Sequence, residues 1–391
     1  MRLAHTSDWH AGRILKRVDR LPELAAVLEH MGDDLEREKV DVLLMSGDVF
    51  DSGAPVAEAE RVVFSFFKRL GRARIETVVI AGNHDSPARM QAWSGLAELV
   101  GVHAVAKPAP HDKGGLVTIR TRAGETAQVA AVPFASPIHF FSALELADGE
   151  TRPHQRYADG LKQIVANVTS VFRPDAVRVL MLHTHVEGAA FSGSERRVHM
   201  GEEWAALPQA IPPDAHYVAL GHIHKPQRLE TAGSPAHYAG SPLQMDFGEV
   251  GEDKGFVLID ARPGQPARTE RIPYRGGRAL QRVRATLADL ERDAALYNRS
   301  DSLLSVRVPM QAPDPDLNAR VRKLLPNALR VEAELPERSL LDAPTAASHS
   351  RSIAPAELYA AFVRKARGEG ALDADLLKEF ASLYEQECAH D

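Results

Sequence analysis

Cysteine is almost absent from this chain of 391 residues, which contains only Cys388. A single cysteine excludes an intrachain disulfide and suits a reducing compartment. No secretory signal is recognisable ahead of Asp8, and no apolar run is long enough to span a bilayer. We therefore expect a cytoplasmic protein, associated with the nucleoid if its substrate is DNA.

An excess of positive charge is also absent. The chain has 47 Lys and Arg against 53 Asp and Glu, a formal net charge of −6 and a pI near 6.3. A protein that holds nucleic acid by global charge alone is more often basic. A DNA substrate is still compatible with this balance, because two divalent cations would add about four positive charges at a site. Local basic patches or a partner could supply further contacts to the DNA backbone.

Strands and helices alternate in the first hundred residues, a rhythm typical of parallel strands with helices outside. The predicted elements are strands at residues 2–6, 41–46 and 76–81 and helices at 21–40, 55–70 and from 86 onward. Ser86 should cap the last of these helices, with Pro87 in its first position. Pro55 suits the first turn of the helix before it.

The rest of the chain is richer in short strands, which favours a two-layered α/β sandwich over a Rossmann sheet. The predicted elements here are strands at 116–121, 127–132, 177–182 and 255–260, a hairpin-like piece at 237–239 and a helix at 157–172. A smaller α+β unit should contain helices at 287–297 and 314–325 and strands at 302–308 and 328–335. We place the domains at 1–274 and 275–340, a polar linker at 341–354 and a tail of two amphipathic helices at 355–391.

Five short polar pieces carry the chemistry, and each follows an apolar, strand-like run. They are Ser7-Asp8-Trp9-His10, Gly47-Asp48, Gly82-Asn83-His84-Asp85, His183 and Gly221-His222-Ile223-His224. Strand ends can converge on one edge of a sheet. Carboxylate, imidazole and amide oxygen ligands suit Mn²⁺, Fe²⁺, Zn²⁺ or Mg²⁺. Glycine at the strand ends permits the backbone angles of a tight turn. The set as a whole indicates a two-metal hydrolase that cleaves phosphoesters.

Each piece alone is a weak signal, since an Asp-x-His pair is usually a surface or capping pair and Asn-His-Asp is often a turn. Five pieces in this order, each at a strand end, are strong support for a metal centre. Two alternatives stay open. His183 and His185 both offer an imidazole, and His183 is favoured because it directly follows the strand. Asp85 either orients His84 or is simply a carboxylate near a helix N-terminus.

In this order the five pieces resemble the calcineurin-like metallophosphoesterases and, within them, the SbcD group of bacterial Mre-type nucleases. The narrower likeness rests on four runs, Leu3 to His10, Ser46 to Asp51, Ala219 to His224 and Tyr238-Ala239-Gly240-Ser241-Pro242. It covers about residues 1–260 clearly. The resemblance implies a metallophosphoesterase β-sandwich flanked by helices, a small α+β capping domain that contacts DNA, and a helical tail that binds an SbcC-type coiled coil.

The resemblance also implies how the ligands are divided between two metal ions. Asp8, His10 and His224 would hold one ion, Asn83, His183 and His222 the other, and Asp48 would bridge them. His84 would be the catalytic group that protonates the leaving oxygen or stabilises the transition state. Asp85 would accept a hydrogen bond from His84 and orient its ring. The expected ions are Mn²⁺, with Mg²⁺ or Fe²⁺ as alternatives that the same ligands accept.

Three functions are compatible with these residues. They are a DNA nuclease that works with an ATPase, a monoesterase or phosphatase of the same superfamily, and a metal-stabilised DNA-binding scaffold without turnover. Phosphatases of this superfamily typically carry arginines beside the motifs, whereas Asp51 is followed here by Ser52-Gly53 and Gly82 is preceded by Ala81. That difference favours a diester. The complete ligand set and His84 disfavour the scaffold.

The resemblance finally implies activities and partners. It suggests a 3′–5′ double-strand exonuclease and single-strand or hairpin endonuclease in DNA repair, recombination and replication. The chain would be a homodimer that binds two SbcC-type SMC-like ABC ATPases to give a heterotetramer. Candidate DNA contacts are Arg13, Lys16, Arg17 and Arg89, with Arg196, Arg197 and Lys225 as weaker ones. Candidate dimer contacts are Phe64, Phe67, Met90 and Trp93. Most surface cations are merely solvated, and an apolar stripe is more often ordinary core.

Overall fold

The computed structural model describes residues 1–121, 123–136, 153–192, 194 and 205–336, together with Tyr359 and Phe380. The chain divides into two units, Met1–Leu335 and Pro336–Asp391, and the fold below is that of the first. The expected linker lies outside the described residues, as does the expected tail apart from Tyr359 and Phe380. The rings of these two residues stack at a centroid distance of 4.1 Å.

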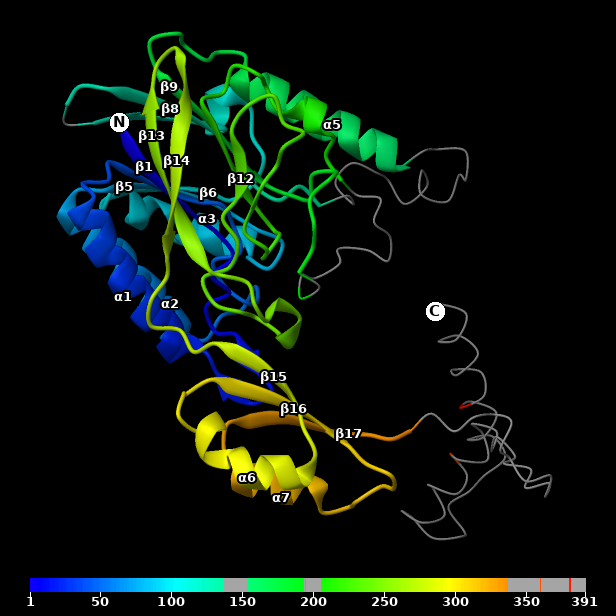
Figure 1. The fold of residues 1–391 in the computed structure, drawn as a ribbon. Coiled ribbons are helices and arrows are strands. Elements are labelled where there is room, and N and C mark those ends of the chain that lie inside the picture. Colours follow the sequence, from blue (N-terminus) through cyan, green and yellow to red (C-terminus); the bar gives the residue numbers. More distant parts are fainter. Residues whose placement is uncertain are drawn as a thin grey trace. The chain divides into compact units, whose positions relative to one another are not determined.

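The first of two large sheets has six strands in the order β14-β13-β1-β4-β5-β6 (Figure 1). Its strands are β1 (Arg2–Thr6), β4 (Val42–Met45), β5 (Glu76–Ile80), β6 (Val102–Val105), β13 (Gly255–Arg262) and β14 (Gln265–Pro273). The strands β1, β4, β5 and β6 run parallel, and β13 and β14 extend the sheet antiparallel. The sequence predicts β1, β4 and β5 to within one residue at each end, but it does not predict β6 or β14.

Three helices cover the outer face of this sheet: α1 (Leu21–Arg37), α2 (Ala57–Ala73) and α3 (Pro87–Glu98). As predicted, α3 begins with Ser86 as its cap, the side chain accepting a hydrogen bond from the backbone N–H of Arg89, and with Pro87 in the first turn. The prediction for α2 is wrong at its start. Val56 is still extended, so Pro55 lies before the helix rather than in its first turn.

The second sheet also has six strands, in the order β11-β12-β10-β9-β8-β7. Its strands are β7 (Leu116–Arg120), β8 (Thr126–Val132), β9 (Val177–His183), β10 (Tyr217–Gly221), β11 (Gln227–Arg228) and β12 (Ala236–Tyr238). The helix α5 (Pro153–Thr169) packs on its outer face. Apolar side chains of both sheets, among them Leu44, Val78, Val129 and Val179, form the core between them. The predicted sandwich is therefore confirmed, with helices outside both sheets.

The small α+β unit follows β14. It contains β15 (Leu280–Arg284), α6 (Leu287–Tyr297), β16 (Leu303–Pro309), α7 (Leu317–Leu324) and β17 (Ala328–Glu334). The three strands form one parallel sheet in the order β15-β16-β17, on which the two helices pack. The sequence predicts α6 with the observed bounds, and it does not predict β15. The prediction for α7 starts three residues too early, because Asp316 is the residue that precedes the helix.

A buried group of charges ties the small unit to α1. Arg20, only 2% exposed, donates to the Glu23 carboxylate and to the carbonyl oxygens of Gln244 and Arg278. Arg278 donates to Glu23 through its backbone N at 2.8 Å, its Nε at 3.0 Å and its Nη2 at 2.7 Å. Burial alone would raise the pKa of Glu23, but the two arginines outweigh it and lower that pKa. The carboxylate is therefore ionised and fixed.

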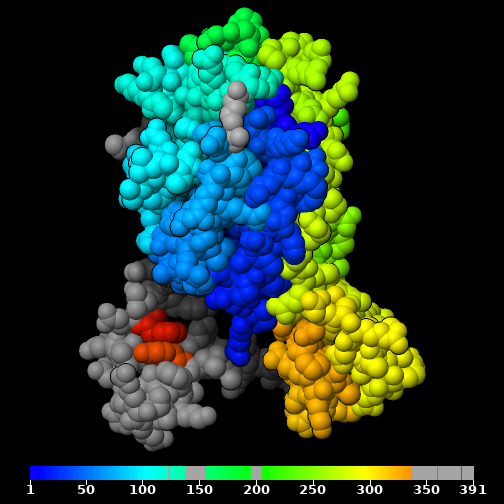
Figure 2. All heavy atoms as spheres, turned by 90° about the vertical axis from the view of Figure 1, so that its left-hand side faces the viewer, coloured from blue at the N-terminus to red at the C-terminus, as the bar shows by residue number. Residues whose placement is uncertain are grey.

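A short hairpin that the sequence does not predict, β2 (Ile14–Leu15) and β3 (Val18–Asp19), also contacts the small unit. Leu15 is buried with Phe247, Leu280 and Leu303. In Figure 2 the dark blue N-terminal segment projects beside the yellow and orange small unit. Within the described ranges, no helix is both long enough and apolar enough to cross a membrane.

Acid should destabilise the folded chain through His5, which is fully buried in β1 with its Nδ1 2.9 Å from the Tyr217 hydroxyl. Burial, reinforced by the nearby His237, lowers the pKa of His5 to about 3. The unfolded chain takes up a proton near its ordinary pKa of 6.5 and the folded chain does not, so stability is lost as pH falls below that value. We expect about 2 kcal/mol less unfolding free energy at pH 5 than at pH 7 from this residue.

Urea unfolding of wild type and His5→Asn at both pH values would measure this loss. Asparagine cannot titrate, and its amide can still bond the Tyr217 hydroxyl. The stability difference between the two proteins should change by about 2 kcal/mol over this pH interval. A difference that is the same at pH 7 and pH 5 would show that His5 is not the source.

Candidate metal centre

The polar pieces that follow the strands come together at one edge of the two sheets. Asp8, His10, Asp48 and His222 all have positive φ angles, of 54°, 45°, 52° and 98°. Such left-handed backbone is uncommon for residues other than glycine and is retained chiefly where the surroundings hold it at functional sites. The turns that leave β1, β4 and β10 therefore aim polar side chains into a shared space instead of continuing the strands.

One group in this space consists of Asp8, His10 and His224, whose ligand atoms lie within 4.8 Å of one another. The Nε2 atoms of His10 and His224 are 3.0 Å apart. Asp8 Oδ1 accepts a hydrogen bond from the backbone N–H of His222 at 3.0 Å. Its other oxygen, Oδ2, is buried and has no hydrogen-bond partner among the described residues. A buried carboxylate oxygen without a donor, on a residue grouped with two imidazoles, is suited to a cation.

A second group adjoins the first and consists of Asn83, His183 and His222. The Asn83 Oδ1 atom lies 3.0 Å from His183 Nε2 and 2.9 Å from His222 Nδ1. His183 Nδ1 lies 2.7 Å from the carbonyl oxygen of Ser46, to which it donates. In the neutral ring that hydrogen bond keeps the proton on Nδ1, so the lone pair is on Nε2, the nitrogen nearest to Asn83, which is the tautomer that a metal ligand needs.

Asp48 lies between the two groups. Its Oδ2 atom is 3.6 Å from His10 Nε2 and 3.5 Å from His183 Nε2, and the residue is 2% exposed. Burial would raise the pKa of Asp48, but His183 and His10 outweigh it and hold that pKa well below its usual range. Burial would likewise lower the pKa of His183, whereas Asp48 raises it to about 9. The carboxylate is therefore ionised at neutral pH and placed to be shared by two cations.

These contacts fit a pair of divalent ions by the chemistry of the donors. The side chains of these two groups and of Asp48 offer only nitrogen and oxygen atoms. Four of the seven are imidazoles, two are carboxylates and one is an amide. This is a donor set that Mn²⁺, Mg²⁺, Fe²⁺ and Zn²⁺ accept. Two metal-capable groups share Asp48, one with His10 and His84 and one with Asp8 and His183. Neutralisation of the buried carboxylates by cations would remove their mutual repulsion.

His84 lies at the rim of the centre, half-buried, with its ring 4.7 Å from that of His10. Its Nδ1 donates to the backbone carbonyl of Asp51 at 2.8 Å, and its backbone N–H donates to Asp48 Oδ1 at 2.8 Å. The side chain is thus held by the loop after β4, with Nε2 left for another partner. The Asp51 side chain also contributes, since its Oδ1 lies 3.2 Å from His10 Nδ1 and 3.2 Å from Arg13 Nη1.

Of the two alternatives for Asp85, its position agrees with the plainer one, because it directly precedes Ser86, the cap of α3. Its carboxylate accepts hydrogen bonds from the backbone N–H groups of Gly82 at 2.9 Å, Phe50 at 3.0 Å and Val49 at 3.2 Å. Burial and the nearby Asp48 raise the pKa of Asp85 to about 6. Asp85 therefore joins the loop after β4 to the loop after β5, and the Asp51 carbonyl, not Asp85, bonds the His84 ring.

The alternative ligand His185 belongs to none of the metal-capable groups among the described residues. Its ring packs against Phe191 at a centroid distance of 4.5 Å, whereas His183 is within reach of Asn83 and Asp48. The difference follows from the strand, because His183 is the last residue of β9 and points to the edge where β10 also ends. The geometry favours His183 over His185.

The candidate DNA contacts are not equivalent. Arg13 is held by Asp51 near the centre, and Lys16 and Arg17 form the exposed tip of the β2–β3 hairpin, with φ angles of 47° and 77°. Arg89 pairs with Glu60 at 2.8 Å. Lys225 is exposed directly after His224. Arg196 and Arg197 lie outside the described residues.

The candidate dimer contacts require a correction. Phe67 and Met90 are each 2% exposed and belong to the core beneath α2 and α3, where Phe67 packs near Trp9. An apolar stripe on a helix does not reveal which of its members face the chain's own sheet. Phe64 and Trp93 are partly exposed, with ring centroids 5.4 Å apart, so they keep surface for a partner.

The residues behind His224 are missing from the sequence-based set. Glu249 is fully buried, with its Oε1 3.2 Å from His224 Nδ1, and Lys254 Nζ lies 2.6 Å from its Oε2. Burial would raise the pKa of Glu249, but the hydrogen bond to His224 and the charge of Lys254 lower it to about 2. A lone Glu after Phe247-Gly248, in the short turn η4 (Phe247–Glu249), has no sequence signature of such a role.

Gly82 should not tolerate a side chain. A Cβ atom there would lie 2.0 Å from Asp48 Oδ1 and 2.3 Å from Asp48 N, so this glycine serves close approach rather than the unusual backbone angles seen at Gly47. We expect Gly82→Ala to displace Asp48, to lower stability by about 1–3 kcal/mol and to weaken metal binding. Thermal unfolding and a Mn²⁺ titration would measure both effects. Gly95→Ala in α3, where a Cβ meets nothing within 4 Å, is the matched control. Equal behaviour of the two variants would contradict the prediction.

A β-sandwich whose strand ends carry two adjoining Asp, Asn and His groups is the arrangement of a dimetal phosphoesterase. The family model described as calcineurin-like phosphoesterase matches residues 1–226, and the one described as type 5 capsule protein repressor C-terminal domain matches residues 277–366. The SbcD subunit of nuclease SbcCD from Bacillus subtilis (strain 168) is 31% identical over 389 residues, which is 98% of this chain and 97% of that protein. The chain therefore belongs to the calcineurin-like phosphoesterases, in the family of the SbcD nuclease subunits.

A second relative in that family, the SbcD subunit of nuclease SbcCD from Rhodobacter capsulatus, is 32% identical over 309 residues, covering 73% of this chain and 75% of that protein. Among solved structures, a dimetal phosphatase from Danio rerio is more distant. It has a TM-score of 0.43 and 10% sequence identity, and the match covers 70% of this chain and 96% of that one.

Proposed function

We propose that this chain is a metal-dependent DNA nuclease that hydrolyses phosphodiester bonds as the SbcD component of an SbcCD-type complex. The observation that carries the proposal is the position of Asp48, whose buried carboxylate lies within 3.6 Å of one ligand from each of the two adjoining groups. Sharing of one carboxylate between two cations is the arrangement that clamps a phosphate for in-line displacement.

The proposed ligands divide as the resemblance implies. Asp8, His10 and His224 would hold one ion, Asn83, His183 and His222 the other, and Asp48 would belong to both. We propose Mn²⁺ as the ion, although the same donors accept Mg²⁺ and Fe²⁺. When bound, the ions would supply charge neutralisation at the phosphate and a lowered pKa for the attacking water.

The chain's own catalytic group in this proposal is His84. Its Nδ1 proton is held on the Asp51 carbonyl, so the proton that it can give up is on Nε2. In the imidazolium form Nε2 would donate to the oxygen that leaves phosphorus, and the ring would become neutral while keeping its bond to Asp51. Asp51 contacts both rings, His10 through its carboxylate and His84 through its backbone carbonyl. It would therefore hold the metal ligand and the acid in fixed positions relative to each other.

A diester suits the surroundings better than a monoester does. A terminal phosphate dianion needs additional cationic donors. Two described basic residues contact the loops that carry the proposed ligands, and both are already paired, Arg13 with Asp51 and Lys254 with Glu249. Linear and hairpin DNA, cut as a 3′–5′ exonuclease and a single-strand endonuclease, is the substrate class we propose. We assign the remaining backbone contacts to Arg13, Lys16 and Arg17, because the hairpin that carries two of them is exposed beside the small unit.

The proposed partners are an SbcC-type SMC-like ABC ATPase and a second copy of this chain, giving a heterotetramer in the cytoplasm. Residues 355–391 would bind the ATPase coiled coil, 275–340 would form the capping domain, and 341–354 would link them. For the homodimer we propose the exposed edge of α2 and α3. Phe64 and Trp93 keep partly exposed rings there, and Leu96 and Leu99 are 72% and 81% exposed nearby. Apolar side chains so exposed favour burial against another surface.

One assay tests the function. The full chain is incubated with Mn²⁺ and either linear duplex DNA or p-nitrophenyl phosphate, with and without the ATPase partner. We expect cleavage of DNA that a chelator abolishes and that Mn²⁺ restores, with little hydrolysis of the monoester. Hydrolysis of the monoester alone would contradict the proposal, and binding of DNA without any cleavage would indicate a scaffold.

A further inference from the structure

The ring of His224 is held on both sides. Its Nε2 faces His10 Nε2 at 3.0 Å, within the group that also contains Asp8. Its Nδ1 lies 3.2 Å from Glu249 Oε1 and 2.7 Å from the hydroxyl of Ser194. When Nε2 gives its lone pair to a metal ion, Nδ1 carries the proton and donates it away from the centre. Glu249 and the Ser194 hydroxyl are both placed to receive that hydrogen bond, and Ser194 in turn donates to Glu249 Oε1, so Glu249 acts on the ring directly and through Ser194.

The carboxylate of Glu249 is itself fixed by several donors. Lys254 Nζ lies 2.6 Å from Oε2, and the backbone N–H of Met245 donates to the same oxygen at 3.1 Å. Lys254 also donates to the carbonyl oxygen of His224 at 2.9 Å. Glu249 is completely buried, and the Lys254 side chain is 7% exposed. Glu249 therefore holds the ring of His224 and Lys254 holds its backbone. The two opposite charges compensate each other although both are buried.

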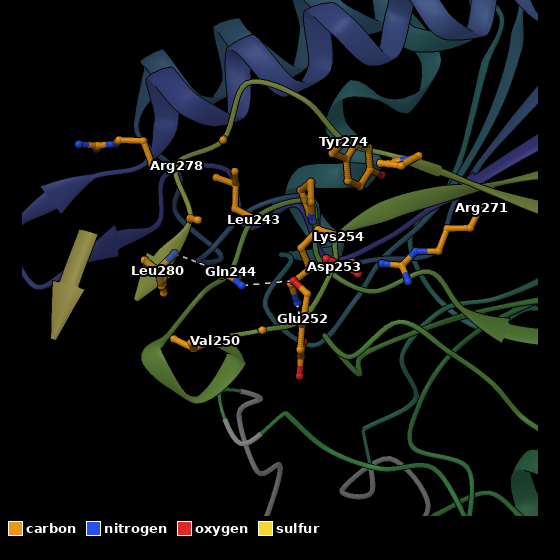
Figure 3. A pocket seen from close by; sticks show the side chains of 15 residues that line it. Leu243, Gln244, Val250, Glu252, Asp253, Lys254, Arg271, Tyr274, Arg278 and Leu280 are labelled. Carbon is orange, nitrogen blue, oxygen red and sulfur yellow. Dashed lines mark hydrogen bonds and ion pairs between the residues drawn. The ribbon is translucent and has the colours of Figure 1, made fainter. Parts of the chain in front are cut away.

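The same turn is connected to the small unit. Lys254, Glu252 and Gln244 line a cavity of about 830 Å³ at the base of that unit (Figure 3). Gln244 Nε2 donates to the carbonyl oxygen of Glu249 at 3.0 Å, and Gln244 Oε1 accepts from the backbone N–H of Leu280, the first residue of β15, at 2.7 Å. One side chain thus spans the turn that carries Glu249 and the first strand of the small unit.

We propose that Glu249 is a positioning residue for the metal ligand His224, with Lys254 as its counter-charge, and that this contact sets the affinity of the metal site formed with Asp8 and His10. The inference rests on the two-metal centre of the proposed function. A carboxylate behind a ligating histidine fixes the ring and raises its basicity, and loss of such a partner typically weakens metal binding by about 10–100-fold.

Two double variants isolate the contact. Glu249→Leu with Lys254→Met removes both charges and the carboxylate, and it leaves the Ser194 hydroxyl as an acceptor for the His224 proton. Glu249→Gln with Lys254→Met removes the same charges, but the amide oxygen can still accept it. Neither double variant leaves a charge at position 249 or 254. The two variants therefore differ only in whether residue 249 can accept a hydrogen bond from His224. Glu252→Gln is the control. Glu252 also pairs with Lys254, at 2.9 Å, but its carboxylate accepts a hydrogen bond from the Ser192 hydroxyl, at 2.9 Å, and not from His224.

The measurement is a Mn²⁺ titration of the full chain, with free Mn²⁺ followed by electron paramagnetic resonance and apo-protein melting recorded beside it. We expect two sites in wild type and in Glu252→Gln. In the leucine variant one site should weaken by about 10–100-fold and the other should not, with the glutamine variant closer to wild type. Equal affinities in the leucine and glutamine variants, or equal weakening of both sites, would overturn the inference. A wild-type chain that binds no Mn²⁺ would overturn the two-metal function as well.

Discussion

Asp48→Asn is expected to lower Mn²⁺-dependent DNA hydrolysis by more than about a hundredfold. Loss of a residue that merely orients a metal ligand reduces activity about 10–100-fold, and Asp48 would be a ligand to both ions. Its Oδ2 lies 3.6 Å from His10 Nε2 and 3.5 Å from His183 Nε2, while its Oδ1 accepts a hydrogen bond from the backbone N–H of His84. An amide could keep that hydrogen bond but offers no negative charge to share.

Both metal sites should weaken together in this variant, which distinguishes it from the Glu249 variants. The measurements are the rate of linear duplex cleavage and the Mn²⁺ stoichiometry. Asp214→Asn is the matched control, since the Asp214 side chain is 52% exposed and pairs only with Arg178 among the contacts that the structure describes. If Asp48→Asn bound two ions with wild-type affinity, Asp48 could not be the shared ligand.

The positions of the proposed ligands could be picked out from the sequence because their signals are local. Asp8, Asp48, Asn83 and His183 each lie within three residues of the end of an apolar run. The ends of neighbouring parallel strands must meet at one edge of a sheet. Glycine beside them marks tight turns. These positions do not depend on the full order of strands in space, so an unpredicted strand such as β6 leaves them unchanged.

The supporting residues could not be predicted, because their roles depend on contacts between distant segments. Glu249 meets His224 across 25 residues, and Asp85 reaches Val49 and Phe50 across 36 and 35 residues. Nothing in a local pattern distinguishes these carboxylates from solvated ones. The sequence places Phe67 on a surface for the same reason, since a helical stripe shows that a face is apolar and not what covers it.

His84→Ala should separate catalysis from metal binding. The ring is not needed to hold either ion in the proposed ligand set, so two Mn²⁺ ions should bind as in wild type. Loss of a general acid lowers the rate by about 10²–10⁴-fold, and we expect kcat for duplex cleavage to fall within that range with little change in KM. The structural basis is the hydrogen bond from Nδ1 to the Asp51 carbonyl, because it leaves Nε2 as the nitrogen that can donate to the phosphate.

The control for His84→Ala is His103→Ala. His103 is partly buried on β6 and pairs with Glu76 at 3.0 Å, and it belongs to none of the metal-capable groups of the described residues. A substrate with a better leaving group should distinguish the two roles open to His84. If the histidine protonates the leaving oxygen, an activated aryl diester needs no proton, and the variant should lose much less activity on it than on DNA. An equal loss on both substrates would assign His84 to stabilising charge on phosphorus instead. If His84→Ala lost one Mn²⁺ site, the residue would be a ligand, as its position beside His10 and Asp48 also allows.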